Sequence, residues 1–177
     1  MPFKSSNRIE VARNFAMERH GDQLWGDQPY VTHLDLVANA ANVFISQGSV
    51  VPSLYQVRPF YREHIGVVSY LHDILEDTST TYDEVCEKFG TAAAEDVESL
   101  TDADGANRKE RKLKTWHKLR RNPIVTFVKC CDRFVNTSGS KREMYRKEFP
   151  SFQSALYVPN QMDYVWKMLH ERTYGDG

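Results

Sequence analysis

The chain has 177 residues, of which 41% are hydrophobic, and its formal net charge at pH 7 is −1. This length and composition suffice for the core of one domain without disulfide or metal staples. The near-neutral charge gives no indication of a nucleic-acid coat or a polybasic membrane patch, so any site for an anion must be local.

The cysteines and the N-terminal segment bear on the compartment. Cys86, Cys130 and Cys131 are odd in number and two are adjacent, which argues against a disulfide framework and favours a reducing environment. No apolar run resembles a signal peptide or reaches the length of a membrane helix. We therefore expect a cytoplasmic protein whose partners include neither membrane nor nucleic acid.

The N-terminal half predicts helices with short connections. Apolar residues at helical spacing indicate a first helix over 6–20 and a second over 32–47, separated by a polar loop over 22–30. After an irregular connection over 49–57, a third helix is expected over 59–76, with a proline in its first turn and no break.

The C-terminal half continues in the same way, and no segment alternates with the period of a strand. The charged stretch 101–122 has two interpretations that stay open: a solvated helix face, or a basic rim for a phosphate-rich substrate. Further helices are expected over 82–89, 92–100, 124–135, 141–157 and 160–171. The pattern predicts an all-α bundle.

Four ionisable side chains stand within six positions of the otherwise apolar third helix: His72, Asp73, Glu76 and Asp77. Residues four apart share one face of a helix, so His72 should lie beside Glu76 and Asp73 beside Asp77. A helix that is otherwise buried would not carry these groups without a compensating charge, which a divalent cation would supply.

His33 and Asp132 complete a candidate metal site. Together with His72 and Asp73 they form a set of two imidazoles and two carboxylates, which suits Mn²⁺, Fe²⁺ or Zn²⁺ better than Mg²⁺. Each residue also has a structural interpretation: a lone histidine is often buried for packing, and Asp132 could pair with Lys129 or Arg133.

These residues lie in stretches that resemble the HD superfamily of metal-dependent phosphohydrolases. Within it, the chain most resembles the hydrolase domain of Rel/SpoT alarmone enzymes and their small stand-alone relatives, including the metazoan SpoT homologue. The matching stretches are Ala16-x-x-x-His20, Pro29-Tyr30-Val31-Thr32-His33, Leu71-His72-Asp73-Ile74-Leu75-Glu76-Asp77-Thr78, Phe89-Gly90, Leu100-Thr101 and Lys129-x-x-Asp132-Arg133-x-x-Asn136.

The resemblance implies a single-domain, HD-type helical bundle over 1–177, with a motif-bearing core over about 8–140 and C-terminal helices over about 141–172. It implies a manganese ion held by the four ligands, with Glu76 and Asp77 as the catalytic pair that orients and activates water. It also implies removal of the 3′-pyrophosphate from guanosine tetra- or pentaphosphate, with Asn136 near the nucleotide sugar.

The chain departs from the family at two arginines. Trp25 stands where the family has an arginine before its Pro-Tyr, and Ser138 stands in place of a later one. A tryptophan can stack on a base but cannot neutralise a phosphate. Lys129 is a candidate phosphate contact, although it could equally be a surface lysine.

The departures keep alternatives open. The substrate could be another nucleoside phosphate, such as a deoxynucleoside triphosphate, or NADPH. In a different class, the chain could be a nucleotide-binding regulator that has lost catalysis. Because both Glu76 and Asp77 are present, the enzyme is the favoured interpretation. The sequence predicts no oligomeric state.

Overall fold

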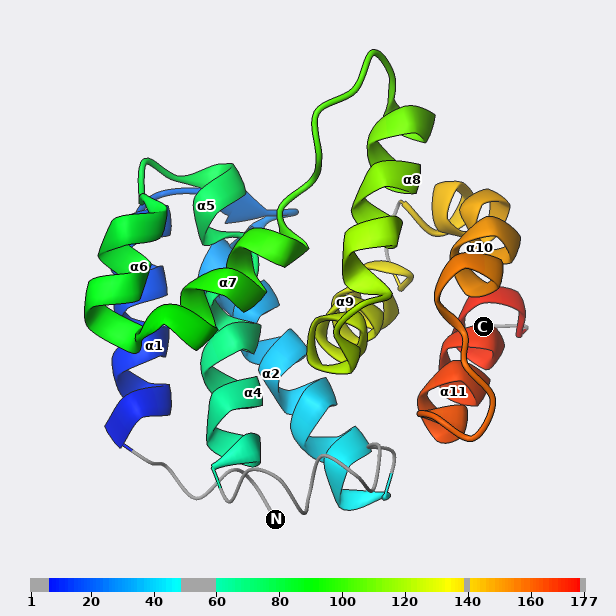
Figure 1. Ribbon diagram of the computed structural model, residues 1–177, viewed down its shortest axis with the longest axis horizontal. Coiled ribbons are helices and arrows are strands. Elements are labelled where there is room, and N and C mark those ends of the chain that lie inside the picture. The colour runs from blue at the N-terminus through cyan, green and yellow to red at the C-terminus, as the bar shows by residue number, and fades with distance from the viewer. Residues whose placement is uncertain (1–6, 49–59, 139–140, 176–177) are drawn as a thin grey trace.

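The computed structural model describes residues 7–48, 60–138 and 141–175. In this part of the chain almost all regular structure is helical (Figure 1). The predicted all-α, HD-type helical bundle is therefore confirmed.

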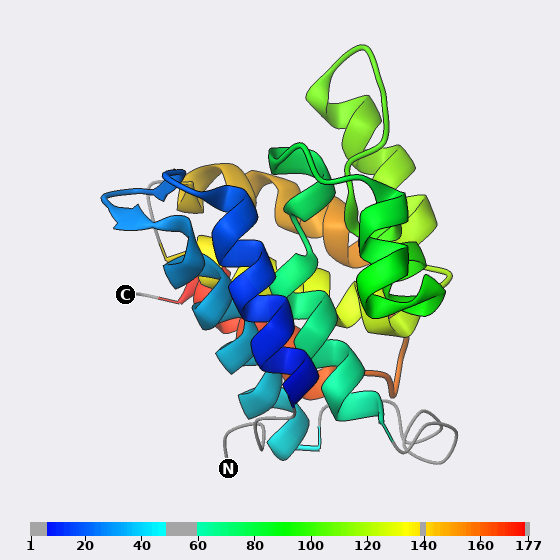
Figure 2. The same ribbon diagram turned by 90° about the vertical axis from the view of Figure 1, so that its left-hand side faces the viewer.

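The centre of the bundle is built from four helices. α1 (Asn7–His20), α2 (Tyr30–Ser46) and α4 (Tyr61–Leu71) lie side by side, as Figure 2 shows, and α2 also packs against α9 (Pro123–Asn136). The apolar spacing that predicted these helices places their hydrophobic residues in one continuous core.

Two pairs of helices enclose this centre on opposite sides (Figure 1). α6 (Tyr82–Phe89) and α7 (Thr91–Leu100) pack on each other, and α7 reaches α4 and α9. α10 (Arg142–Leu156) and α11 (Asp163–Tyr174) pack against the other side of α9. The most apolar helix of the second half of the sequence is thus covered from both sides.

α9 has a well-defined start because Asn122 caps it and Pro123 occupies its first turn. The Asn122 side chain accepts from the Ile124 N–H at 2.9 Å and donates to Asp96 of α7 at 2.6 Å. Cys130 and Cys131 are buried along this helix, whereas Cys86 on α6 is partly exposed.

α8 (Arg108–Leu119) forms the upper wall of the molecule in Figure 1 and contacts α7, α9 and α10. In sequence, α8 makes up about half of the charged stretch 101–122. Asn107 caps it by accepting from the Glu110 N–H at 3.0 Å.

The structure differs from the predicted elements in two places. The third helix is not continuous, because α4 ends before His72 and a short α5 (Ile74–Asp77) follows. The expected polar loop contains a two-stranded hairpin of β1 (Leu24–Trp25) and β2 (Gln28–Pro29), which the sequence analysis missed because each strand has only two residues.

Three expectations fall outside the described residues: the helix start at position 6, the connection over 49–57 and the proline-led start at position 59. Among the helices that the structure describes, none is long and apolar enough to cross a membrane.

Candidate functional site

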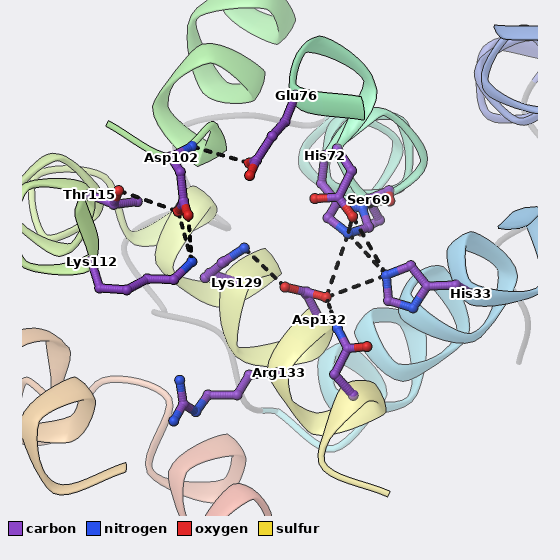
Figure 3. Close-up of polar contacts among 12 residues, drawn as sticks. His33, Ser69, His72, Glu76, Asp102, Lys112, Thr115, Lys129, Asp132 and Arg133 are labelled. Carbon is purple, nitrogen blue, oxygen red and sulfur yellow. Dashed lines mark hydrogen bonds and ion pairs between the residues drawn. The ribbon is translucent and has the colours of Figure 1, made fainter. Parts of the chain in front are cut away.

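The structure brings the four predicted metal ligands together at the centre of the bundle. One ligand atom from each of His33, His72, Asp73 and Asp132 lies within 4.8 Å of the others. The two Nε2 atoms are 3.3 Å apart, and His33 Nε2 lies 3.4 Å from Asp132 Oδ1 (Figure 3). Such a convergence of imidazole and carboxylate groups fits a divalent metal ion.

The ligands come from three parts of the chain. His33 is in the first turn of α2 and Asp132 is in the third turn of α9. His72 and Asp73 occupy the break between α4 and α5, which replaces the predicted continuous helix. Because the helix is interrupted there, Asp73 Oδ2 lies 2.9 Å from His72 Nε2, although neighbours on a helix point about 100 degrees apart.

A second contact fixes which nitrogen of His72 faces the cluster. His72 Nδ1 donates to the Ser69 carbonyl at 2.8 Å, so Nε2 is the nitrogen directed at the other ligands. An outward hydrogen bond of this kind is the usual way in which a metal-binding histidine is oriented.

The electrostatics of the cluster favour a positive charge at its centre. Burial opposes a charge on the His72 imidazole, but the Asp73 and Asp132 carboxylates outweigh burial and raise the pKa of His72 to about 10. Burial likewise opposes ionisation of Asp132, but Lys129 and the two histidines hold the pKa of Asp132 well below its ordinary value. Two carboxylates kept ionised in a buried site are well suited to bind a cation.

An outer layer of donors holds the ligand carboxylates. Tyr30 donates to Asp73 Oδ2 at 2.6 Å, Asn136 donates to Asp132 Oδ1 at 2.6 Å, and Lys129 Nζ lies 3.0 Å from Asp132 Oδ2. Trp25 in turn donates from Nε1 to Asn136 Oδ1 at 3.1 Å. Tyr30 received no role in the sequence analysis, since the Pro-Tyr motif does not show where its hydroxyl points.

Glu76 and Asp77 lie on α5 beside the cluster. Glu76 Oε2 accepts from the Asp102 backbone N–H at 3.2 Å, and Asp77 Oδ2 accepts from Gln23 at 3.0 Å. Burial, and then the charge of Asp102, raise the pKa of Glu76. The expected pairing of His72 with Glu76 on one continuous helix is wrong, because His72 lies in the break before α5 and Glu76 lies on α5.

Most of these groups face one cavity of about 650 Å³. Apart from the buried His72, its lining includes the residues predicted to act on metal, water or substrate: Trp25, His33, Asp73, Glu76, Asp77, Lys129, Asp132 and Asn136. Lys129 is not a surface lysine, because its side chain is only 15% exposed.

The two interpretations of the charged stretch 101–122 each apply to some of its residues. Arg108 and Lys112 of α8 line it, as a basic rim requires. Lys109 and Lys114 of the same helix are exposed, as a solvated face requires. Helix α8 therefore presents cations to both the cavity and the solvent.

Comparison with known proteins identifies the relatives of the chain. A guanosine-3′,5′-bis(diphosphate) 3′-pyrophosphohydrolase of Aquifex aeolicus is 30% identical over 162 residues, which cover 87% of this chain and 21% of that protein. The MESH1 protein of Xenopus tropicalis is named for the same activity. It is 27% identical over 135 residues, which cover 76% of this chain and 70% of that protein. The chain is a relative of the Rel/SpoT-type hydrolases.

The Rel/SpoT-type fold is shared as well. A solved structure described as a metazoan ortholog of SpoT that hydrolyzes ppGpp matches with a TM-score of 0.73 over 97% of each chain, at 19% sequence identity. No protein-family model matches the chain. The chain spans about a fifth of the length of the Aquifex relative and about two thirds of the Xenopus one.

Proposed function

We propose that the chain is a metal-dependent phosphohydrolase that removes the 3′-pyrophosphate from guanosine 3′,5′-bis(diphosphate). The observation that carries this proposal is the four-ligand cluster within 4.8 Å, three of whose residues line the same cavity as two further carboxylates. The named activity of the Aquifex and Xenopus relatives supports this choice of substrate.

The proposed metal ligands are His33, His72, Asp73 and Asp132, and the proposed ion is Mn²⁺, with Fe²⁺, Zn²⁺ and Co²⁺ as alternatives. When bound, such an ion supplies Lewis acidity toward a phosphoryl oxygen and lowers the pKa of water. The donor set supports a metal of this class, because mixed imidazole and carboxylate ligation is uncommon for Mg²⁺.

In this proposal Glu76 and Asp77 orient the attacking water, and Glu76 accepts its proton. The oxygen of that water attacks the phosphorus bonded to the 3′-oxygen, the P–O3′ bond breaks, and the 3′-oxygen leaves with a proton. The raised pKa of Glu76 supports its role, since a general base works best with a pKa near the working pH.

The walls of the cavity suggest how a nucleotide would be held. Lys129 and Arg108 line the cavity and supply positive charge, which suits a ligand with several phosphates. Trp25 offers a ring for stacking on the base, and Asn136 lies beside it at the proposed position of the sugar.

The substitution of Trp25 for an arginine keeps a second group of substrates in view: other nucleoside phosphates, and NADPH. A silent nucleotide-binding regulator is disfavoured because both carboxylates of the proposed catalytic pair face the cavity. The three free thiols support the cytoplasm as the proposed compartment.

The test is a release assay for phosphate and pyrophosphate with Mn²⁺ and with a chelated control. The substrates are guanosine 3′,5′-bis(diphosphate), common nucleoside phosphates and NADPH. We expect metal-dependent pyrophosphate from the first and strong loss of it in Glu76→Gln. Release from another nucleotide alone would reassign the substrate, and no release from any would leave the binding regulator.

A further inference from the structure

We propose that Asp102 and Lys112 are positioning residues that hold Glu76 in its catalytic orientation. The inference rests on the proposed function, because it assumes that Glu76 acts on water. Neither residue is one of the four proposed metal ligands. Neither lies in the stretches that resemble the Rel/SpoT hydrolases.

The first contact is made by the backbone of Asp102. Its N–H donates to Glu76 Oε2 at 3.2 Å, immediately after Thr101 ends α7. Figure 3 shows the Glu76 side chain reaching toward this nitrogen, while the Asp102 carboxylate points the other way, toward Lys112. A single backbone donor thus orients one oxygen of the carboxylate and leaves the other for the cavity.

The segment that carries this donor is itself fastened to α8. Lys112 Nζ contacts both carboxylate oxygens of Asp102, at 2.7 and 2.9 Å. The Thr115 hydroxyl accepts from the Ala103 N–H at 2.9 Å, and Lys118 Nζ donates to the Thr101 carbonyl at 2.8 Å. Residues 101–103 are therefore held to three consecutive turns of the helix.

Charge explains why a lysine is needed at this place. Asp102 and Glu76 would be two carboxylates at close range, and their mutual repulsion would drive the Glu76 side chain away. Lys112 compensates the Asp102 charge and turns it toward α8. The raised pKa of Glu76 agrees with the proximity of the two acids.

The pair differs from an ordinary surface ion pair. The side chains of Lys112 and Asp102 are 15% and 16% exposed, whereas those of Lys114 and Glu110 on the same helix are 54% and 42% exposed. Exposed pairs contribute little, so the buried pair is the one with a structural consequence for the cavity. Lys114 of the exposed pair, two residues from Lys112, supplies a matched control.

The experiment compares Lys112→Met, Asp102→Ala and Lys112→Arg with Lys114→Met as the matched control. For each variant we would measure kcat, KM and the affinity for Mn²⁺. We expect kcat to fall about tenfold to a hundredfold in the first two variants, since a small misplacement of a reacting group has such costs. In those two variants KM and metal affinity should stay within about twofold of the wild type. Lys112→Arg should recover much of the rate because it keeps the cation. Lys114→Met should match the wild type.

Other results would overturn the proposal. A raised KM at unchanged kcat would mean that Lys112 contacts a substrate phosphate instead. An equal loss of kcat, metal affinity and melting temperature would mean that the pair only supports the fold.

A readout that does not need turnover separates this proposal from the proposed function. Hydrogen exchange of the Asp102 amide should be slow in the wild type and at least tenfold faster in Glu76→Ala and in Lys112→Met. If the wild type hydrolyses none of the nucleotides, the proposed function fails. The positioning role of Asp102 and Lys112 is then judged by hydrogen exchange alone. A rapidly exchanging Asp102 amide in the wild type would contradict that role.

Discussion

The indole of Trp25 and the carboxamide of Asn136 lie beside the cluster of four proposed metal ligands. Asn136 accepts from Trp25 through its oxygen and donates to Asp132 through its nitrogen, so the indole fixes which way round the amide lies. Asp132 Oδ1 then faces both histidine rings. A residue that lines the cavity thereby orients a proposed ligand through one intermediate side chain.

Replacing Trp25 with phenylalanine removes the N–H and keeps a ring. We expect the affinity for Mn²⁺ to fall about tenfold, since outer partners of metal ligands typically have effects of that size. Calorimetric titration measures it. Trp166→Phe, made in the core at α11, is the control and should leave metal affinity unchanged. Equal affinities in all three proteins would show that the indole does not orient Asp132.

Tyr30 makes the corresponding contact on Asp73. Tyr30→Phe removes the 2.6 Å hydrogen bond to Asp73 Oδ2 while the ring can still stack on His20. We expect weaker metal binding, by about tenfold, because the carboxylate loses the donor that orients it. Circular dichroism would check that the helices are intact. Unchanged metal affinity would assign Tyr30 to packing alone.

Among the helices, prediction from sequence succeeds where apolar spacing carries the information. The predicted helices over 6–20, 32–47 and 124–135 correspond closely to α1, α2 and α9. It failed at the break between α4 and α5, because the apolar periodicity runs through positions 72 and 73 without interruption. There the contacts among side chains from α2, α4 and α9 decide the backbone, and those contacts are not local in sequence.

The capping of α9 provides a test at this scale. Asn122→Ala removes the cap and the hydrogen bond to the buried Asp96, which keeps its contact with His64. We expect a loss of about 1–3 kcal/mol in the free energy of unfolding, measured by urea titration.

Asn107→Ala at the exposed start of α8 is the matched control for that variant. It removes a cap of the same type without a buried partner and should cost about 0.5–1 kcal/mol. Equal losses in the two variants would show that the contact between Asn122 and Asp96 adds nothing to the cap.

For the whole molecule, the fold class was predictable because the segments with periodic apolar residues favoured helix and none showed strand alternation. The convergence of the four proposed ligands was inferred from residue types and from the resemblance, and the structure brings them within 4.8 Å. The proposed role of Asp102 and Lys112 in positioning Glu76 could not be inferred from the sequence, because Asp102 contributes a backbone N–H, which almost any residue carries. The single-domain organisation over 1–177 stays a prediction.

Binding of a metal ion at the centre should stabilise the entire bundle, since its ligands join α2, the α4–α5 break and α9. At a free Mn²⁺ concentration of about 100 times the Kd, the gain is about 2.7 kcal/mol. For a chain of this length that corresponds to a rise of roughly 5–10 °C in Tm. Thermal melts with Mn²⁺ and with a chelator would measure it, and His72→Ala should abolish the difference.

The burial of two thiols on α9 has a chemical consequence. Burial raises the pKa of both Cys130 and Cys131, and only a thiolate attacks an alkylating reagent at an appreciable rate. A maleimide should therefore modify the partly exposed Cys86 alone in the native protein and all three cysteines after denaturation. Because Asp132 directly follows Cys131, the number of labels per chain, read by mass spectrometry, reports whether the helix that carries this ligand is packed in place.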